Sequence, residues 1–491
     1  MRLPKITSSL VLLSAFLLLS GCSRNPVSGK RELIFMSQDQ EKAIGQQSHP
    51  SVVATMGLYE DKKLQDFIND KGQAMAKISH RSDLPFQFFI VDSPVVNAFA
   101  VPGGYVYFTR GIMAHFNNEA EFAGVLGHEI GHITARHSAR QQRTQILSQV
   151  GLIAGVMVSE QFRQMADAAQ QSLGLFLLSH SRAHESESDE IGVEYSSKIG
   201  YDAVEMADFF GTLKRLSERS GQVIPTFQST HPDPGDRQQT VKKLAQQYQK
   251  KHPGTYVVNR DSYMRMIEGM VYGEDPKQGF VENSVFYHPE LKFQFPVPKE
   301  WRTENSPIQF QMAPKDGKSL MLLTLAQGST LDEAAQNVIK QYNFKVLENT
   351  KRTINGNQAL VLVSEQQPQQ QQGQAQAPQD PNTVVRVGTW LIQYGGNIYA
   401  LHGMSYAAQF TTNLPTFRTV AEGFRILTDP DKLNRKPERI LVKTVPRNGT
   451  FEETMRSLGM PANRLEDLGT LNGMQPKDVV QQGTLIKIIG K

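Results

Sequence analysis

One short segment of the sequence carries residues that could bind a metal ion and activate water. It reads His128-Glu129-Ile130-Gly131-His132. Positions four apart differ by only about 40° around an α-helix, so both imidazoles would project from one face and could bind a single metal ion. Glu129 would lie about 60° from His132, close enough to reach a metal-bound water without being a ligand. The spacing therefore predicts one catalytic zinc ion per chain, and the alternative is an exposed helical pair without a metal.

A second segment offers the ligand that this pair lacks. Two histidines and a water leave one position of a tetrahedral zinc site open. Glu185 and Asp189 are four residues apart and would share one face of a helix that ends near Gly200. One carboxylate could complete the zinc site while the other accepts the free N–H of a ligating imidazole. The alternative is a solvated acidic face, which is the usual meaning of such a run of charges.

His137 is a further candidate because it follows His132 by five positions. That spacing places it about 140° around the helix. There is no glycine at Ala135 to break the helix, so an arrangement with three histidine ligands is disfavoured. We expect His137 to support the site from behind or to lie on the surface.

The elements that must position these residues can be read from the neighbouring pattern. A helix is predicted to begin at Asn118, with Glu121 completing a capping box. Before it, residues 86–91 read as a strand, and residues 97–101 and 105–108 read as a hairpin joined by a Pro-Gly-Gly turn. Residues 146–178 are helix-prone and are interpreted as a flap over the domain.

The N-terminus predicts export and a lipid anchor. Residues 1–21 read as a signal peptide, with Arg2 and Lys5 before a short apolar run. The run ends in Leu-Ser-Gly-Cys, which resembles the bacterial lipobox and predicts lipidation of Cys22. Ser23 stands where that family has Asp in proteins kept at the inner membrane. The resemblance implies the periplasmic face of the outer membrane of a Gram-negative bacterium.

Length and composition suggest several domains. The chain has 491 residues, 52 Lys+Arg against 48 Asp+Glu and a net charge of +4, which does not favour nucleic-acid binding. The fold class predicted is multidomain α+β, with a mainly helical domain that holds a hairpin or small sheet. The predicted divisions are a signal peptide (1–21), a lipidated tether (22–40), a metal-binding domain (41–270), an α+β domain with one helical stretch at 331–342 and a disordered Gln/Pro-rich loop at 366–381 (280–430), and a short terminal unit (440–491).

Three motifs together resemble a known family. The segment 128–132, then Glu185-x-x-x-Asp189, then His231-Pro-Asp-Pro with Arg237 look like the gluzincin metalloproteases that include HtpX, BepA, LoiP and the zinc-type CAAX prenyl protease. The resemblance extends to about residue 263. It implies that the zinc ligands are His128, His132 and Glu185, that Glu129 is the general base and that Asp189 bonds a ligand imidazole.

The resemblance also implies roles for two residues of the third motif. His231 would approach the metal in a latent state and swing away on activation, or help to bind the transition state. A turn histidine before proline is the alternative reading of His231. Arg237 is a candidate contact to the substrate or the transition state. Glu187 is a rival ligand by its chemistry, but the spacing to Asp189 favours Glu185.

The two other domains each resemble a known small domain. Residues 440–491 resemble a LysM unit, a family that binds N-acetylglucosamine-containing glycans such as peptidoglycan, although Asn448-Gly-Thr stands where Gly-Asp-Thr is usual. The middle domain resembles small α/β sandwiches of the PsbP kind, with no activity assigned.

Taken together, the sequence predicts a zinc-dependent endopeptidase of the cell envelope. It would hydrolyse unfolded or misassembled envelope polypeptides, with strand 97–101 either pairing with the extended substrate backbone or serving only as a core hairpin. The alternative is a latent, mainly non-proteolytic chaperone or peptidoglycan-tethered assembly factor.

Overall fold

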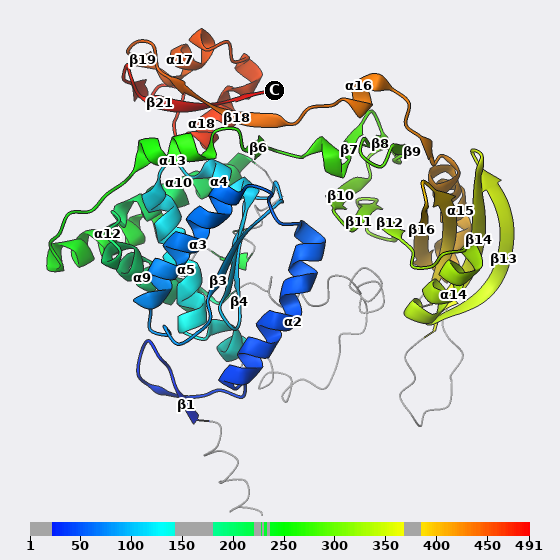
Figure 1. Cartoon of the computed structure of the whole chain (residues 1–491), viewed down its shortest axis with the longest axis horizontal. Coiled ribbons are helices and arrows are strands. Elements are labelled where there is room, and N and C mark those ends of the chain that lie inside the picture. The colour runs from blue at the N-terminus through cyan, green and yellow to red at the C-terminus, as the bar shows by residue number, and fades with distance from the viewer. Residues whose placement is uncertain (1–21, 143–179, 220–226, 228–229, 233–235, 368–383) are drawn as a thin grey trace, which may run out of the picture.

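The structure is a computed structural model that describes residues 22–142, 180–219, 227, 230–232, 236–367 and 384–491 (Figure 1). It contains helices and several separate sheets, which confirms a multidomain α+β architecture. In the described ranges, no helix is both long and apolar enough to cross a membrane. The signal peptide and the proposed flap at 146–178 lie outside the described residues.

Helices surround segment 128–132 in the first part of the chain. Their bounds are α2 (Gln38–Met56), α3 (Lys62–Lys77), α4 (Arg110–His115), α5 (Glu119–Thr134), α9 (Arg182–Lys198), α10 (Val204–Arg219), α12 (Arg237–Lys251) and α13 (Arg260–Ile267). Every residue of α5 is buried, so this helix is the centre of the domain. The Asn118 side chain caps α5 by accepting from the Glu121 N–H. The Glu121 carboxylate accepts from the Asn117 N–H instead of that of Asn118, so only half of the predicted capping box forms.

Helix α9 packs directly against α5 because both lack side chains at the crossing. A Cβ added at Gly127 would lie 2.9 Å from the carbonyl oxygen of Gly192, closer than real Cβ contacts allow. The two backbones therefore approach closely, and the N-terminal half of α9 is held beside the histidines of α5. As predicted, α9 passes through Glu185 and Asp189 and ends just before Gly200, which has a φ of +89°.

A small sheet lies on the other side of α5. Its strand order is β3-β5-β4, with β3 (Gln87–Val91) parallel to β5 (Tyr105–Thr109) and β4 (Ala98–Val101) antiparallel to it. Val101 pairs with Tyr105 across the turn, so the predicted hairpin is confirmed. Strand β4 is at the edge of this sheet. Ahead of the helices, β1 (Cys22–Arg24) and β2 (Arg31–Leu33) form a hairpin near the N-terminus.

The C-terminal segment joins the core of the helical domain. Its elements are β18 (Glu438–Thr444), β19 (Gly449–Thr450), α17 (Phe451–Ser457), a 3₁₀ turn η2 (Ala462–Arg464), α18 (Leu465–Leu471), β20 (Val479–Val480) and β21 (Leu485–Gly490). Strand β18 pairs with β21 and with β6 (Val271–Tyr272). Ile486 and Ile488 are buried in the same hydrophobic cluster as Phe116 and Leu126. Between them, the Lys487 ammonium is fully buried and donates to the carbonyl oxygens of Ala114 and Phe116, each at 2.9 Å.

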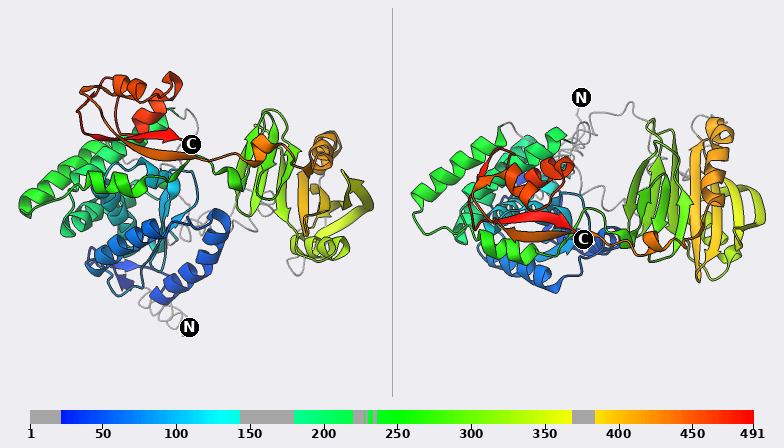
Figure 2. Two further views of the ribbon diagram at one scale, coloured as in Figure 1. Left: turned by 45° about the horizontal axis from the view of Figure 1, so that its top comes forward. Right: turned by 90° about the horizontal axis from the view of Figure 1, so that it is seen from above.

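The middle domain has cores of its own and extends to one side of the molecule (Figure 2). One sheet has the order β17-β9-β8-β7 and a larger one the order β10-β11-β12-β16-β15-β14-β13. The strands are β7 (Phe280–Glu282), β8 (Val285–His288), β9 (Phe293–Pro296), β10 (Arg302–Ser306), β11 (Gln309–Ala313), β12 (Ser319–Leu325), β13 (Phe344–Ile354), β14 (Asn357–Gln366), β15 (Val385–Tyr394), β16 (Asn397–Tyr406) and β17 (Arg425–Ile426).

The helices of this domain correct one prediction. Helix α14 (Leu331–Tyr342) is the helical stretch that we expected, but α15 (Ala407–Glu422) is a second one. Pro415 lies inside α15, and a proline usually ends a helical pattern. The burial of Phe410 and Phe417 under the sheet stabilises the helix all the same. Most of the Gln/Pro-rich loop, residues 368–383, lies outside the described residues.

Candidate metal centre

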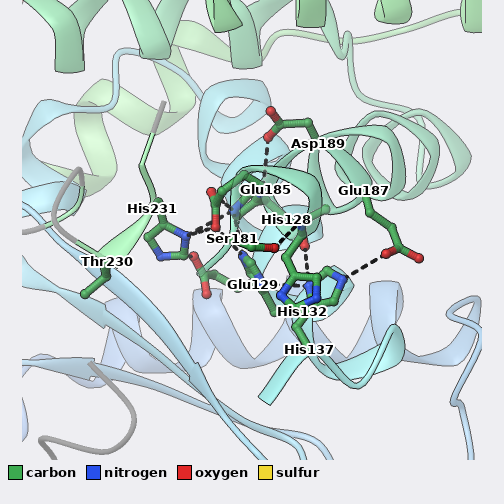
Figure 3. A network of polar contacts seen from close by, with 12 residues as sticks. His128, Glu129, His132, His137, Ser181, Glu185, Glu187, Asp189, Thr230 and His231 are labelled. Carbon is green, nitrogen blue, oxygen red and sulfur yellow. Dashed lines mark hydrogen bonds and ion pairs between the residues drawn. The ribbon is translucent and has the colours of Figure 1, made fainter. Parts of the chain in front are cut away.

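Four side chains from three segments converge on one point (Figure 3). The Nε2 atoms of His128 and His132 lie 2.9 Å apart. The Glu185 carboxylate on α9 lies 3.5 Å from each of them. His231, which follows α10 in the sequence, places its Nδ1 3.3 Å from His128 Nε2 and 3.2 Å from Glu185 Oε1. One ligand atom from each of the four lies within 4.8 Å of the others, and all four residues are buried.

The donor set fits zinc. Imidazole nitrogens and one carboxylate are the ligands of catalytic zinc sites, and four such atoms at these separations can surround one ion. Glu129 supplies an independent observation, because its side chain is fully buried and neither carboxylate oxygen forms a hydrogen bond among the described residues, while His231 Nε2 lies 3.5 Å from Oε1. A buried carboxylate without a donor is costly unless a cation or its water compensates it.

The pKa values of Glu185 and Glu129 are shifted in opposite directions, which suits a metal ligand and a general base respectively. Burial acts to raise the pKa of Glu185, but the imidazoles of His231 and His128 outweigh it and lower the pKa well below its usual value. Glu185 is therefore an anion, as a ligand must be. Burial raises the pKa of Glu129, and the nearby imidazoles only partly offset this effect. A carboxylate with a raised pKa is a stronger base.

Asp189 and Arg237 hold one of the imidazoles from behind. His128 Nδ1 lies 2.9 Å from Asp189 Oδ1, so the N–H at this position leaves Nε2 free to face the cluster. Arg237 donates to both oxygens of Asp189 through Nε at 2.8 Å and Nη2 at 2.7 Å. The same Nη2 lies 3.2 Å from Glu185 Oε2, and the guanidinium stacks 4.0 Å from the Phe210 ring. This geometry favours a positioning role for Arg237, and its contact with a substrate stays a prediction.

The position of His137 differs from the one that a continuous helix would give it. Helix α5 ends at Thr134, and Arg136 adopts a left-handed φ of +56°. The chain therefore leaves the helix without a glycine, and His137 turns back beside His132 at a distance of 2.9 Å between the two Nδ1 atoms. The expectation of a continuing helix is wrong for this reason. His137 is fully buried, and it contacts a candidate ligand instead of joining the four converging residues.

Two more observations complete the surroundings of the cluster. His180 stacks on His132 with 4.1 Å between ring centroids, and no signal in the sequence singles it out. Glu187 points away from the four converging residues and lies 3.1 Å from His137 Nε2 (Figure 3). Residues of the β4–β5 hairpin, among them Ala100 and Gly103, line a small cavity together with His132. The edge strand and the metal centre are therefore neighbours.

The segment that holds this cluster matches the model of a known protein family. Residues 62–245 match the model of Peptidase family M48. The matched range contains α5, α9 and His231, so all four converging residues fall inside it. The family match, the relatives below and the His/Glu cluster together support a metalloendopeptidase whose site is compatible with zinc.

Curated relatives point in the same direction. The chain is similar to the beta-barrel assembly-enhancing protease of Yersinia pestis, with 31% identity over 61% of this chain and 59% of the relative. The protein of the same name from Escherichia coli is 29% identical over 43% of this chain and 45% of the relative. The mitochondrial metalloendopeptidase OMA1 of Arabidopsis thaliana is 32% identical over 36% and 35%. The chain spans about half the length of the curated relatives it matches.

A solved structure of cyanobacterial PsbP from Synechocystis aligns with 30% of this chain and 96% of its own, at 12% identity and a TM-score of 0.24. A TM-score this low does not establish a shared fold. The PsbP-like assignment of the middle domain and the LysM-like assignment of residues 440–491 stay predictions.

Proposed function

We propose that this protein is a zinc-dependent endopeptidase of the bacterial cell envelope that hydrolyses peptide bonds in misfolded or misassembled envelope proteins. The observation that carries the proposal is the convergence of His128, His132 and Glu185 beside a buried Glu129 whose carboxylate forms no hydrogen bond among the described residues. Two imidazoles, one carboxylate and a free carboxylate base are the components of hydrolysis at a metal centre.

Each residue has one task in the proposed reaction. His128, His132 and Glu185 would hold the zinc ion, which when bound polarises the scissile carbonyl and lowers the pKa of water. Glu129 accepts the proton of the attacking water and returns it to the departing amine, as its raised pKa favours. Asp189 keeps the proton of His128 on Nδ1.

His231 is the control element of this proposal. Its Nδ1 lies among the other three ligand atoms, so in this conformation it can occupy the fourth position of the metal. A zinc ion with four protein ligands has no open position for the substrate. The latent state would therefore end when His231 moves away, after which it could help to bind the transition state.

Edge strand β4 would bind the substrate. It is unpaired on its outer side within the sheet order β3-β5-β4, and its hairpin lines a cavity with His132. An extended peptide that adds to this edge would bind mainly through its backbone, so many sequences could be accepted. That breadth suits a protease of misfolded proteins.

The envelope location rests on the N-terminus and on the relatives. The predicted signal peptide and lipidation site at Cys22 support a periplasmic protein anchored in the outer membrane. Two of the similar proteins are named for the enhancement of beta-barrel assembly. We extend this by analogy to the substrates of the present chain. Glycan binding by residues 440–491 is a separate part of the proposal.

Casein digestion by the full-length mature protein tests the proposal. The wild type should digest casein, lose this activity in a chelator and regain it with zinc. Glu129→Gln should bind zinc and keep its fold, yet lose about 10²–10⁴-fold in rate, because the amide cannot accept the proton. Lys198→Gln, which changes an exposed residue of α9, is the control. An untreated wild type without activity would favour the chaperone alternative, and a Glu129→Gln rate within about tenfold of the wild-type rate would show that Glu129 is not the general base.

A further inference from the structure

The turn after α5 brings a second buried histidine against a candidate zinc ligand. Arg136 holds this turn, with Nε donating to Glu41 at 2.9 Å and Nη2 donating to the Met36 carbonyl oxygen at 2.7 Å. His137 follows directly, and its Nδ1 lies 2.9 Å from His132 Nδ1. The contact therefore depends on a turn that the protein stabilises with a buried ion pair.

The partners of His137 determine where its proton is. Its Nε2 lies 3.1 Å from Glu187 Oε2, and Arg140 Nη1 donates to the same oxygen at 2.6 Å. A carboxylate paired with arginine accepts hydrogen bonds and does not donate them, so His137 carries its proton on Nε2. A neutral imidazole then has a lone pair on Nδ1. The Ser188 hydroxyl, 3.3 Å from Nδ1, can donate to the same lone pair.

The same reasoning extends to His132. Because His137 Nδ1 is an acceptor, the His132 Nδ1 that lies 2.9 Å from it must be the donor of this contact. His132 therefore donates from Nδ1, and its lone pair is on Nε2. That atom is the one that faces His128 and Glu185. A proton on Nε2 would prevent this atom from binding a metal.

We propose that His137 is a positioning residue that fixes the metal-binding tautomer of His132, and that Glu187 and Arg140 hold His137 in the required state. The proposal rests on the proposed zinc site. It gives His132 the same kind of support from behind that Asp189 gives His128, with a neutral imidazole in place of a carboxylate (Figure 3).

The chain of contacts continues to the N-terminal hairpin. Arg140 Nε lies 3.2 Å from Glu32 Oε2 on strand β2, which pairs with the strand that begins at Cys22. Asn25 donates to the other Glu32 oxygen at 3.1 Å. The metal centre is thus linked through three charged side chains to the segment that we expect to carry the lipid anchor.

Substitutions that move the acceptor atom separate positioning from packing. In His137→Asn, the side-chain oxygen can take the place of Nδ1 and accept from His132. In His137→Gln, the polar atoms lie nearer the place of Nε2, so the contact with Glu187 can remain while the contact with His132 is lost. His137→Ala loses both contacts. The matched controls are His115→Ala and His115→Asn, which alter a buried histidine on α4 whose Nδ1 contacts the Gly111 carbonyl oxygen.

The measurement is the zinc dissociation constant of the full mature chain, obtained by competition with a chelator. His137→Ala and His137→Gln should weaken zinc binding about 10–100-fold, and His137→Asn should recover most of that loss. The His115 variants should bind zinc as the wild type does. In the zinc-loaded wild type, ¹⁵N NMR should show His132 protonated on Nδ1 and bound through Nε2.

The outcomes distinguish this inference from the proposed function. If the wild type binds zinc and digests casein but His137→Ala binds zinc equally well, only the inference is overturned. Equal losses in the Ala, Asn and Gln variants would overturn it too, since they would indicate packing. A His132 bound through Nδ1 contradicts it directly. A wild type that binds no zinc overturns the proposed function and the inference with it.

Discussion

Asp189→Asn should damage the metal centre and the stability of the fold by separate routes. The carboxylate accepts three hydrogen bonds, one from His128 Nδ1 and two from Arg237. An asparagine has one acceptor oxygen. If its oxygen faces His128, its amide N–H meets an arginine N–H, and if the amide is turned, it donates to His128 and moves the proton of that imidazole to Nε2.

The size of each effect follows from the contacts. Loss of the hydrogen bond that orients a ligand histidine typically weakens metal binding about 10–100-fold, or about 1.4–2.7 kcal/mol. Removal of one partner of a buried ion pair costs up to about 3–5 kcal/mol. Arg237 keeps Glu185 at 3.2 Å and the stacking on Phe210, so we expect the stability loss in the metal-free protein to be below that range or at its lower limit, about 2–3 kcal/mol.

A double substitution separates the two routes. Asp189→Asn with Arg237→Gln removes the buried cation that has lost the Asp189 carboxylate, so it should regain part of the stability while zinc binding stays weak. The assays are chelator competition for zinc and thermal unfolding of the metal-free proteins followed by circular dichroism, with exposed Lys198→Gln as the control. Wild-type zinc affinity in Asp189→Asn would refute the role of Asp189 in orienting His128. Equal recovery of both properties in the double variant would show that the two effects are one.

Three further predictions concern control, anchoring and acid stability. His231→Ala should raise the rate of casein digestion if His231 mainly blocks the open position of the metal, or lower the rate if His231 stabilises the oxyanion. An unchanged rate, zinc affinity and pH profile would exclude His231 from the site. Cys22→Ala should abolish palmitate labelling and outer-membrane fractionation, and persistence of both would refute the lipidation site. Burial lowers the pKa of His402 from 6.5 to about 4, so the middle domain should lose up to about 3 kcal/mol of stability between pH 6.5 and 4, where the unfolded chain binds the extra proton. His288, whose pKa burial also lowers to about 4, adds a loss of similar size, so His402→Asn should remove roughly half of the total loss, measured by fluorescence of Trp301 and Trp390, and an unchanged pH dependence would contradict this assignment.

The local parts of the structure were predictable because short-range geometry determines them. The i, i+4 spacing of His128 and His132 has a fixed meaning on any α-helix, and the Pro-Gly-Gly turn fixes the register of the strands that it joins. The Asn118 cap and the end of α9 before Gly200 are likewise set within a few residues. Each of these features can be checked in a window of the sequence.

The features that the sequence did not predict depend on contacts between residues that are far apart in the chain. The turn at Arg136 has no glycine, and its left-handed backbone is held by Glu41, which is 95 residues away. Helix α15 contains Pro415 and forms because the sheet offers an apolar face. The position of Lys487 beneath α4 depends on a contact across 373 residues. Local patterns carry no information about such contacts.

The placement of β21 has a consequence for the timing of folding during synthesis. The chain emerges from the ribosome N-terminus first, so α5 and its histidines exist long before residues 485–490 do. Until then the hydrophobic cluster around Phe116 lacks Ile486 and Ile488, and the carbonyl oxygens of Ala114 and Phe116 lack their ammonium partner. The core that supports the metal centre therefore closes only after the C-terminal strand has been made. In a chain built in this way, part of the core beside α4 and α5 is missing until almost all residues have been made.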